Sequence, residues 1–235
     1  MKLVLEELES VKEFALELTA KENSIDIVID NFMIPPIPLN NSVDSGDVNL
    51  VIEGNHLGRF LVIELLRAQI LASKWKRVVV LSPKYYQNSQ ANFSARTFER
   101  PANRSLSQIY DELHIATNLI VNEYAYKFRS KGAAINAVYP GFVPSDPSTQ
   151  LNGDRSLTES IIDWIGYKSE QEAAEAILWA ATSPAAQNVS GQYLVDCRAQ
   201  IPHPLVLNNY LAEDFHNTTY VSIIQSFLLL AKLGL

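Results

Sequence analysis

Cysteine is nearly absent from this chain, and histidine is scarce. The single cysteine, Cys197, cannot form an internal disulfide, and we interpret it as a small buried hydrophobic residue. The four histidines show no His-x-x-x-His pair, so we expect no bound metal; they are His56, His114, His203 and His216. Basic runs are also absent, and the net charge is -7. Nucleic acid is therefore excluded as a main partner, because phosphate neutralisation needs clustered Lys and Arg.

Long hydrophobic runs are missing at both ends of the chain. The stretch Met1 to Glu7 is acidic and has no signal-peptide hydrophobic region. The most apolar run, Tyr220 to Leu235, is shorter than the roughly 20 residues of a membrane span, and Lys232 interrupts it. We interpret this run as a terminal packing helix, and we expect a cytoplasmic protein with no transmembrane segment.

Glycine is also sparse, with nine residues in 235. Neither a Gly-x-x-x-Gly-x-Gly nor a Gly-x-Gly-x-x-Gly pattern occurs in the sequence. Such glycines let the backbone approach a pyrophosphate at the N-terminus of a helix. The sequence therefore predicts no dinucleotide-binding loop in this chain.

Apolar residues are plentiful, at 47%, and 235 residues are enough for one domain over 1–235. Short β-branched runs predict four buried strands, at 25–29, 77–81, 133–139 and 191–195. Helical spacing of apolar residues predicts helices between them, at 7–21, 47–73, 107–129 and 169–182. The last of these opens with a capping-box match between Ser169 and Glu172. The alternation predicts an α/β fold, with a Rossmann-like parallel sheet flanked by helices.

Ligands on parallel sheets bind beyond the carboxyl ends of the strands. The segments to inspect are therefore 30–33, 82–84, 140–145 and 196–198. The first reads Asp30-Asn31-Phe32-Met33, and the helix after it carries Gly54-Asn55-His56-Leu57-Gly58-Arg59-Phe60. The third strand ends in Asn136-Ala137-Val138-Tyr139-Pro140-Gly141. Near the end stands Val189-Ser190-Gly191-Gln192-Tyr193-Leu194-Val195-Asp196-Cys197.

In this order and spacing the segments resemble the short-chain dehydrogenase/reductases. That family carries Asn-Asn-Ala-Gly, Val-Asn-His-Leu-Gly-His-Phe, Val-Ser-Ser, Tyr-x-x-x-Lys and Asn-Ala-x-x-Pro-Gly at the corresponding places. The segment after Val189, with Thr182-Ser183-Pro184 before it, resembles the retinol-dehydrogenase branch. The resemblance extends from about Leu3 to beyond Pro204.

The resemblance assigns catalytic positions, several of them altered. Asn55 takes the place of the proton-relay asparagine, and Tyr110 that of the proton-transferring tyrosine. A phenol with an ordinary pKa of about 10 needs a nearby cation at neutral pH, and the family supplies a lysine four residues on. Here that position is His114. The substrate-orienting serine falls at Pro83, and we expect the neighbouring Ser82 to point away, because side chains alternate along a strand.

Each of these positions also has a structural interpretation. Asn55 can simply bridge backbone groups, and Tyr110 can be an ordinary half-buried aromatic residue. We expect His114 to be a surface or packing residue. Lys84 remains an alternative source of the missing cation.

On the cofactor side, the resemblance implies contacts from Asn31, Pro140, Gly141 and Ser145, and only if NAD(P) binds. The family's adenine-contacting Asp aligns with Val4. Phe32 and Met33 replace the small residues of the tight turn and would crowd a nicotinamide riboside. We therefore expect no bound cofactor.

These departures favour a catalytically impaired or inactive protein that acts as a binding or regulatory module. The alternative is an NAD(P)-dependent oxidoreductase of carbonyl or alcohol substrates whose N-terminal cofactor-binding segment is missing from this chain. A third possibility is a fragment without an independent role.

The strand at Ile25 to Ile29 has a further consequence. In the family it pairs with the first strand, which has no counterpart here, so we expect an open sheet edge that only Leu3 to Leu5 could partly cover. Unpaired apolar edges favour association. We therefore expect a homo-oligomer or a protein partner at this edge.

Overall fold

The computed structural model describes residues 1–32, 51–82, 93–99, 106–141 and 168–233. The strands are β1 (Ile27–Asp30), β2 (Arg77–Leu81), β3 (Ala134–Tyr139), β4 (Tyr193–Val195) and β5 (Arg198–Gln200). The longer helices are α1 (Leu8–Lys21), α3 (Arg59–Ala72), α4 (Leu106–Phe128), α6 (Glu170–Thr182) and α7 (Asn209–Leu233). Shorter helical segments are η1 (Glu53–Gly58), η2 (Thr97–Glu99), η3 (Arg129–Lys131), η5 (Pro184–Ala186) and η6 (Pro204–Leu207).

The strands form one sheet in the order β1-β2-β3-β4-β5. The first four are parallel, in a register that pairs Val78 of β2 with Val28 of β1 and with Ile135 of β3. The predicted α/β sheet is therefore confirmed. The prediction of four strands was one short, because β5 pairs antiparallel with β4. All three residues of β5 are exposed, so no apolar pattern marks this strand in the sequence.

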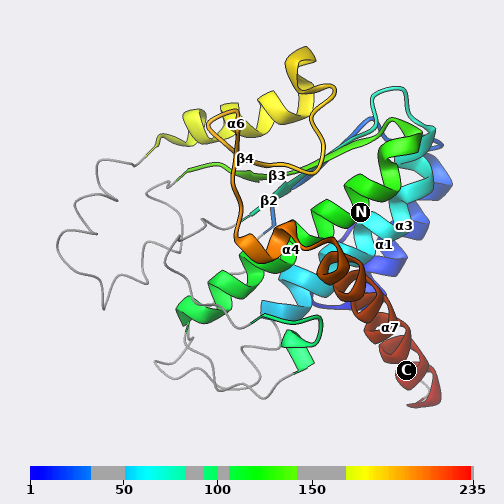
Figure 1. Ribbon diagram of the computed structural model, residues 1–235. Coiled ribbons are helices and arrows are strands. Elements are labelled where there is room, and N and C mark those ends of the chain that lie inside the picture. Colours follow the sequence, from blue (N-terminus) through cyan, green and yellow to red (C-terminus); the bar gives the residue numbers. More distant parts are fainter. Residues whose placement is uncertain (33–50, 83–92, 100–105, 142–167, 234–235) are drawn as a thin grey trace.

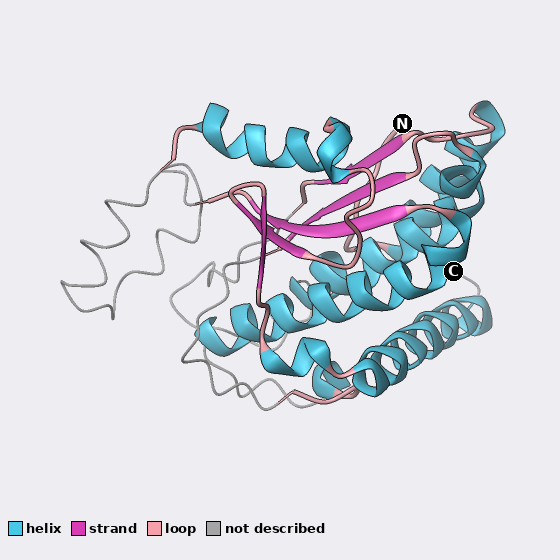
Figure 2. Ribbon diagram, turned by 45° about the horizontal axis from the view of Figure 1, so that its top comes forward, coloured by secondary structure: helices cyan, strands magenta, loops and turns pink. Residues whose placement is uncertain are grey.

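Helices cover both faces of the sheet (Figures 1 and 2). α1, α3 and α4 lie on one face, and α7 packs outside α4. α6 lies on the other face, above β2 and β3. The larger core lies between the sheet and the α3–α4 layer, where Phe60, Ile135 and Tyr124 are buried. A smaller apolar cluster lies under the alanines of α6.

The start of α6 shows how local sequence decides local structure. Ser169 caps α6: its hydroxyl accepts from the backbone N–H of Glu172, and the Glu172 carboxylate accepts from the backbone N–H of Ser169. The predicted capping box is thereby confirmed.

The helix predicted over 47–73 is helical from 51, but it contains a π-helical turn at η1 before α3 begins. Residues 47–50 lie outside the described part.

β1 stands at one end of the sheet, as the open-edge prediction requires. Its side chains are partly or well exposed, and Ile29 is 42% exposed, whereas Val79 on β2 is 1% exposed. Leu3 to Leu5 form no strand with it. Leu5 is buried against the start of α3 instead, with its backbone carbonyl close to Gly58. Within the described residues, β1 therefore has a strand partner on one side only.

α7 is the longest of the described helices, and its C-terminal half extends away from the sheet (Figure 1). Among the described residues, no helix combines the length and apolarity that a membrane crossing requires. The packing role predicted for the apolar run is confirmed in part, since Ile223 is buried while Tyr220, Ile224 and Leu228 are exposed.

Candidate functional site

Three polar side chains lie at the carboxyl ends of the parallel strands, those of Asp30, Ser82 and Asp196. Asp30 ends β1 and Ser82 follows β2, whereas Pro140 and Gly141 follow β3. Asp196 follows β4 in the tight turn to β5, where Asp196 and Cys197 both have positive φ angles. This is the edge at which parallel sheets bind ligands.

Behind the end of β2 lies a buried hydrogen-bonded cluster. The Nδ1 atom of His114 lies 3.2 Å from the Ser82 hydroxyl, and Asn118 donates to that hydroxyl at 3.0 Å. The Asn118 amide also donates to the His114 carbonyl at 2.8 Å, one turn back on α4. Tyr193 of β4 meets the His114 ring edge-on, with centroids 4.9 Å apart. His114 and Ser82 are each 1% exposed.

Of the two structural interpretations of His114, the buried position agrees with a packing residue and excludes a surface one. The prediction that Ser82 points away is wrong, because its hydroxyl lies next to His114. The alternation rule was misapplied, because β2 ends at Leu81 and Ser82 lies beyond the strand. Since Asn118 already donates to the Ser82 oxygen, the hydroxyl proton can be directed at Nδ1 of His114.

Asn55 lies in the π-helical turn η1, where it is 4% exposed. Single π-turns inside helices are frequent at functional sites. The close approach of Leu5 to Gly58 accompanies this turn: a Cβ added at Gly58 would stand 2.0 Å from the Leu5 carbonyl oxygen. The chain therefore needs glycine here to bring its N-terminal segment onto the helix.

His56, next to Asn55, is also buried. Its Nε2 atom lies 2.9 Å from the Thr219 hydroxyl of α7, and its ring stacks on Phe215 with centroids 4.8 Å apart. Burial lowers the pKa of His56 to about 3, and Arg59 one turn further on adds to the effect. A neutral imidazole is therefore the form at physiological pH.

Arg59 and Asp30 form a buried ion pair across the ends of β1 and β2. Arg59 Nε donates to the Asp30 carboxylate at 2.5 Å, and Nη2 donates to the Leu81 carbonyl at 2.7 Å. The other Asp30 oxygen accepts from the backbone N–H of Phe32 at 3.2 Å. Sequence reasoning missed this pair. Opposite charges at Asp30 and Arg59, at two positions within the family-like motifs, were the available signal.

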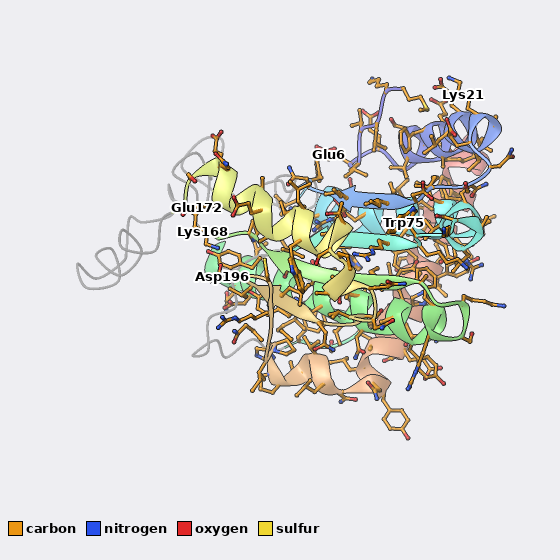
Figure 3. All side chains as sticks on the ribbon, turned by 90° about the horizontal axis from the view of Figure 1, so that it is seen from above. Glu6, Lys21, Trp75, Lys168, Glu172 and Asp196 are labelled. Atoms are coloured by element: carbon orange, nitrogen blue, oxygen red, sulfur yellow. The ribbon has the colours of Figure 1, made fainter. Side chains whose placement is uncertain are left out.

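A second ion pair lies at the same edge of the sheet, between the residue after β4 and the segment before α6. Lys168 and Asp196 are in direct contact, and Figure 3 shows them together beside the N-terminal end of α6. Gly141 lies beneath, with φ of +107°, and a Cβ added there would stand 2.6 Å from Cδ of Lys168. The aliphatic part of Lys168 therefore lies directly against Gly141.

The remaining candidate residues divide by position. Tyr110 lies one turn before His114 on α4, but its side chain is outside the described part of the structure. Asn31 is exposed, and Pro140 is partly exposed. Ser145, Pro83, Met33 and Lys84 lie outside the described residues. Cys197 is partly exposed in its turn, which corrects the prediction that it is buried. Among the residues described, no group of three His, Cys, Asp or Glu side chains could hold a metal ion.

Comparison with known proteins places the fold. A short-chain dehydrogenase/reductase family protein matches with a TM-score of 0.59 and 22% identity, over 83% of this chain and 73% of its own. An NADPH-bound carbonyl reductase from chicken fatty liver matches with a TM-score of 0.59 and 14% identity, over 86% of this chain and 75% of its own. These matches define the fold class as that of the short-chain dehydrogenase/reductases. No family model matches the sequence.

Sequence comparison finds similar proteins among the retinol dehydrogenases. Retinol dehydrogenase 14 from Homo sapiens is 26% identical over 223 residues, which cover 94% of this chain and 65% of the relative. Its counterpart from Mus musculus is 27% identical over 224 residues, with 94% and 66% covered. The chain thus spans about two thirds of the length of these curated relatives. The chain is therefore similar in sequence to retinol dehydrogenases, and it has the fold of the short-chain dehydrogenase/reductases.

Proposed function

We propose that this chain is a catalytically impaired member of its family, with little or no redox activity, that serves as a binding or regulatory module. The main support is the Ser82–His114–Asn118 cluster. It holds a buried imidazole where the family's lysine would stand, with Nδ1 of His114 3.2 Å from the Ser82 hydroxyl, to which Asn118 donates. A phenol at Tyr110 would then lack the lysine ammonium that lowers its pKa in the family.

The described cofactor-side residues do not fit a nicotinamide. The side chain of Lys168 lies against Gly141, where close approach to the backbone would be needed. Phe32 packs against the core where the family turn has a small residue. Arg59 and Asp30 pair with each other, so neither side chain is available to a cofactor.

A second candidate is an NAD(P)-dependent oxidoreductase acting on a carbonyl or alcohol substrate. It is favoured by Asn55, which is retained within a π-helical turn, and by the retained Pro140-Gly141 after β3. It is also favoured by the likeness to a carbonyl reductase that is named as NADPH-bound.

Titration calorimetry of the purified chain with NADPH and with NADH separates the two candidates at the binding step. The first candidate predicts no saturable heat up to millimolar cofactor. A dissociation constant in the micromolar range, typical of substrate and cofactor affinities in working enzymes, would favour the second.

Turnover is measured with retinol and retinaldehyde, the substrate pair suggested by the relatives' names, and with a small aldehyde. The first candidate predicts no rate above the background without protein. If turnover is found, Tyr110→Phe must abolish it, and turnover that survives would place the site elsewhere. The double variant His114→Lys with Pro83→Ser restores two family residues. It is expected to remain inactive, because the cofactor side would still not fit.

For the binding role we propose that the β1 edge pairs with a second copy of the chain. Ile27, Val28 and Ile29 are apolar, and no lysine or proline blocks pairing. Antiparallel pairing of two such edges about a two-fold axis would satisfy both at once. Asp30, which such pairing would bring toward the partner strand, already has a counter-charge in Arg59.

Light scattering across a concentration series tests this pairing. Ile29→Lys places a charge on the edge and is expected to shift the chain toward monomer. The control Leu16→Lys alters an apolar side chain of α1 that is 62% exposed, and should leave the association unchanged. A wild-type monomer at every concentration, with its β1 amides protected from exchange, would exclude the dimer.

A further inference from the structure

The packing of α7 on the body of the protein depends on two buried histidines. The inner face of α7 presents Phe215, Thr219 and Ile223, all less than 5% exposed, to α4 and its neighbours. His216 lies on this face of α7, and His56 approaches it from η1. Neither histidine has a role in the candidate site.

His216 is held as a hydrogen-bond acceptor. Lys127 Nζ of α4 lies 3.1 Å from Nδ1 and 3.0 Å from Nε2 of the His216 ring. An ammonium only donates, so at least one ring nitrogen must carry a lone pair. Protonation would place an N–H on both nitrogens and set an imidazolium against the ammonium at this distance.

The other charged groups around His216 are already engaged. On α4, Glu123 pairs with Lys127 at 3.4 Å. On α3, Glu64 pairs with Arg67 at 3.4 Å and accepts from the Tyr124 hydroxyl at 2.8 Å. The rings of Phe60 and Tyr124 also pack on His216, with centroids 4.9 and 5.3 Å away. Burial, and then Lys127, lower the pKa of His216 to about 4. A hydrogen bond with Asn217 acts in the opposite direction and raises the pKa of His216.

The side chain of His56 is also held by a hydrogen bond to α7. The Thr219 hydroxyl donates to the Phe215 carbonyl at 2.8 Å, so its oxygen is left to accept from Nε2 of His56. Phe98 and Phe215 pack on the His56 ring, with centroids 4.9 and 4.8 Å away. Among the described residues, the charged group that acts on His56 is Arg59, a cation that already pairs with Asp30. A second positive charge on His56 would therefore have no compensation within this contact.

We propose that α7 is an acid-sensitive latch, in which protonation of His56 and His216 releases the helix from α3 and α4 and exposes the apolar faces between them. Release of the helix would expose Phe60 and Phe215, which are each 1% exposed in the docked state. This inference does not rest on the catalytic state of the protein.

The direction of the effect follows from linkage. Both histidines have docked pKa values below the ordinary 6.5, so docking is complete above pH 6.5 and weakens as the pH falls from there toward 4. For His216 the full shift would weaken docking about 30-fold between pH 7.5 and 5. The Lys127 side chain is 34% exposed, and screening by solvent reduces this to about tenfold.

Amide hydrogen exchange of the wild-type chain at pH 7.5 and 5, corrected for intrinsic rates, measures the latch. Opening over residues 212–223 is expected to rise at least about tenfold at pH 5, while residues 77–81 of β2 keep their protection. His216→Gln retains an acceptor for Lys127 but cannot be protonated, and should reduce the rise. Combining it with His56→Gln should remove the rise. His203→Gln, a buried histidine outside α7, should leave it intact.

Three outcomes would overturn the proposal. The first is equal protection of residues 212–223 at both pH values. The second is an undiminished rise in the double variant. The third is simultaneous loss of protection in α7 and β2, which would indicate global acid unfolding rather than release of one helix.

Discussion

The contribution of the Arg59–Asp30 ion pair to stability can be tested directly. This pair lies at the carboxyl ends of β1 and β2, beside the candidate site. Arg59 is 5% exposed and Asp30 11% exposed, so both charges are largely removed from water. The guanidinium also holds the Leu81 carbonyl, which ties the ends of β1 and β2 together. Arg59→Met keeps an unbranched apolar stem but removes the guanidinium, which leaves the Asp30 carboxylate buried without its partner.

Removing one member of a buried pair typically costs about 3–5 kcal/mol, because the remaining charge stays desolvated. In a chain of this size, each kcal/mol lowers the melting temperature by about 2–4 °C. Arg59→Met is therefore expected to lower it by roughly 6–20 °C. Urea unfolding followed by circular dichroism gives the free-energy difference directly.

Two further variants make the result specific. Arg67→Met removes a cation from the same helix that is 50% exposed and pairs with Glu64 at 3.4 Å. It should cost less than about 1 kcal/mol. Adding Asp30→Asn to Arg59→Met removes the stranded charge and should recover a large part of the loss. If Arg59→Met costs no more than Arg67→Met, or if Asp30→Asn recovers nothing, the ion pair does not hold the two strands as argued.

Three other variants test local features. Gly58→Ala places a Cβ 2.0 Å from the Leu5 carbonyl oxygen and should destabilise the protein by at least about 2 kcal/mol in urea unfolding. Gly132→Ala meets no atom within 4 Å but has φ of +67°, so it should cost about 1 kcal/mol; equal effects at the two glycines would contradict the close approach. Ser169→Ala removes the N-cap of α6 and should cost about 1 kcal/mol at pH 7. Hydrogen bonds from Ser169 lower the pKa of Glu172, so that part of the stabilisation is present above pH 4.5 and is lost as the pH falls further; a Ser169→Ala effect that grows in acid would contradict this.

Local sequence was sufficient to predict a strand where the residues of that strand alone show the pattern. The run Arg77 to Leu81 is buried throughout and has three β-branched valines at its centre, and its bounds were predicted without error. β1 begins two residues later and ends one residue later than predicted, because the N–H of Ile25 donates to the Gln69 carbonyl rather than to a strand. β5 was missed because its pairing depends on the turn at Asp196 and Cys197, where two residues without glycine's freedom adopt positive φ.

The sequence by itself determined the family resemblance, the layered α/β fold and the positions that would bear on catalysis, because periodicity and motif spacing are properties of neighbouring residues. Only the tertiary structure decided which of those residues meet. Ser82 and His114 are 32 positions apart, Asp30 and Arg59 are 29 apart, and His56 and Thr219 are 163 apart. Contacts over such separations follow from how strands and helices pack, and each buried polar group must find its partner within that packing. The burial of His114, the charge pair at the sheet edge and the histidine contacts beneath α7 therefore became visible only in the folded chain.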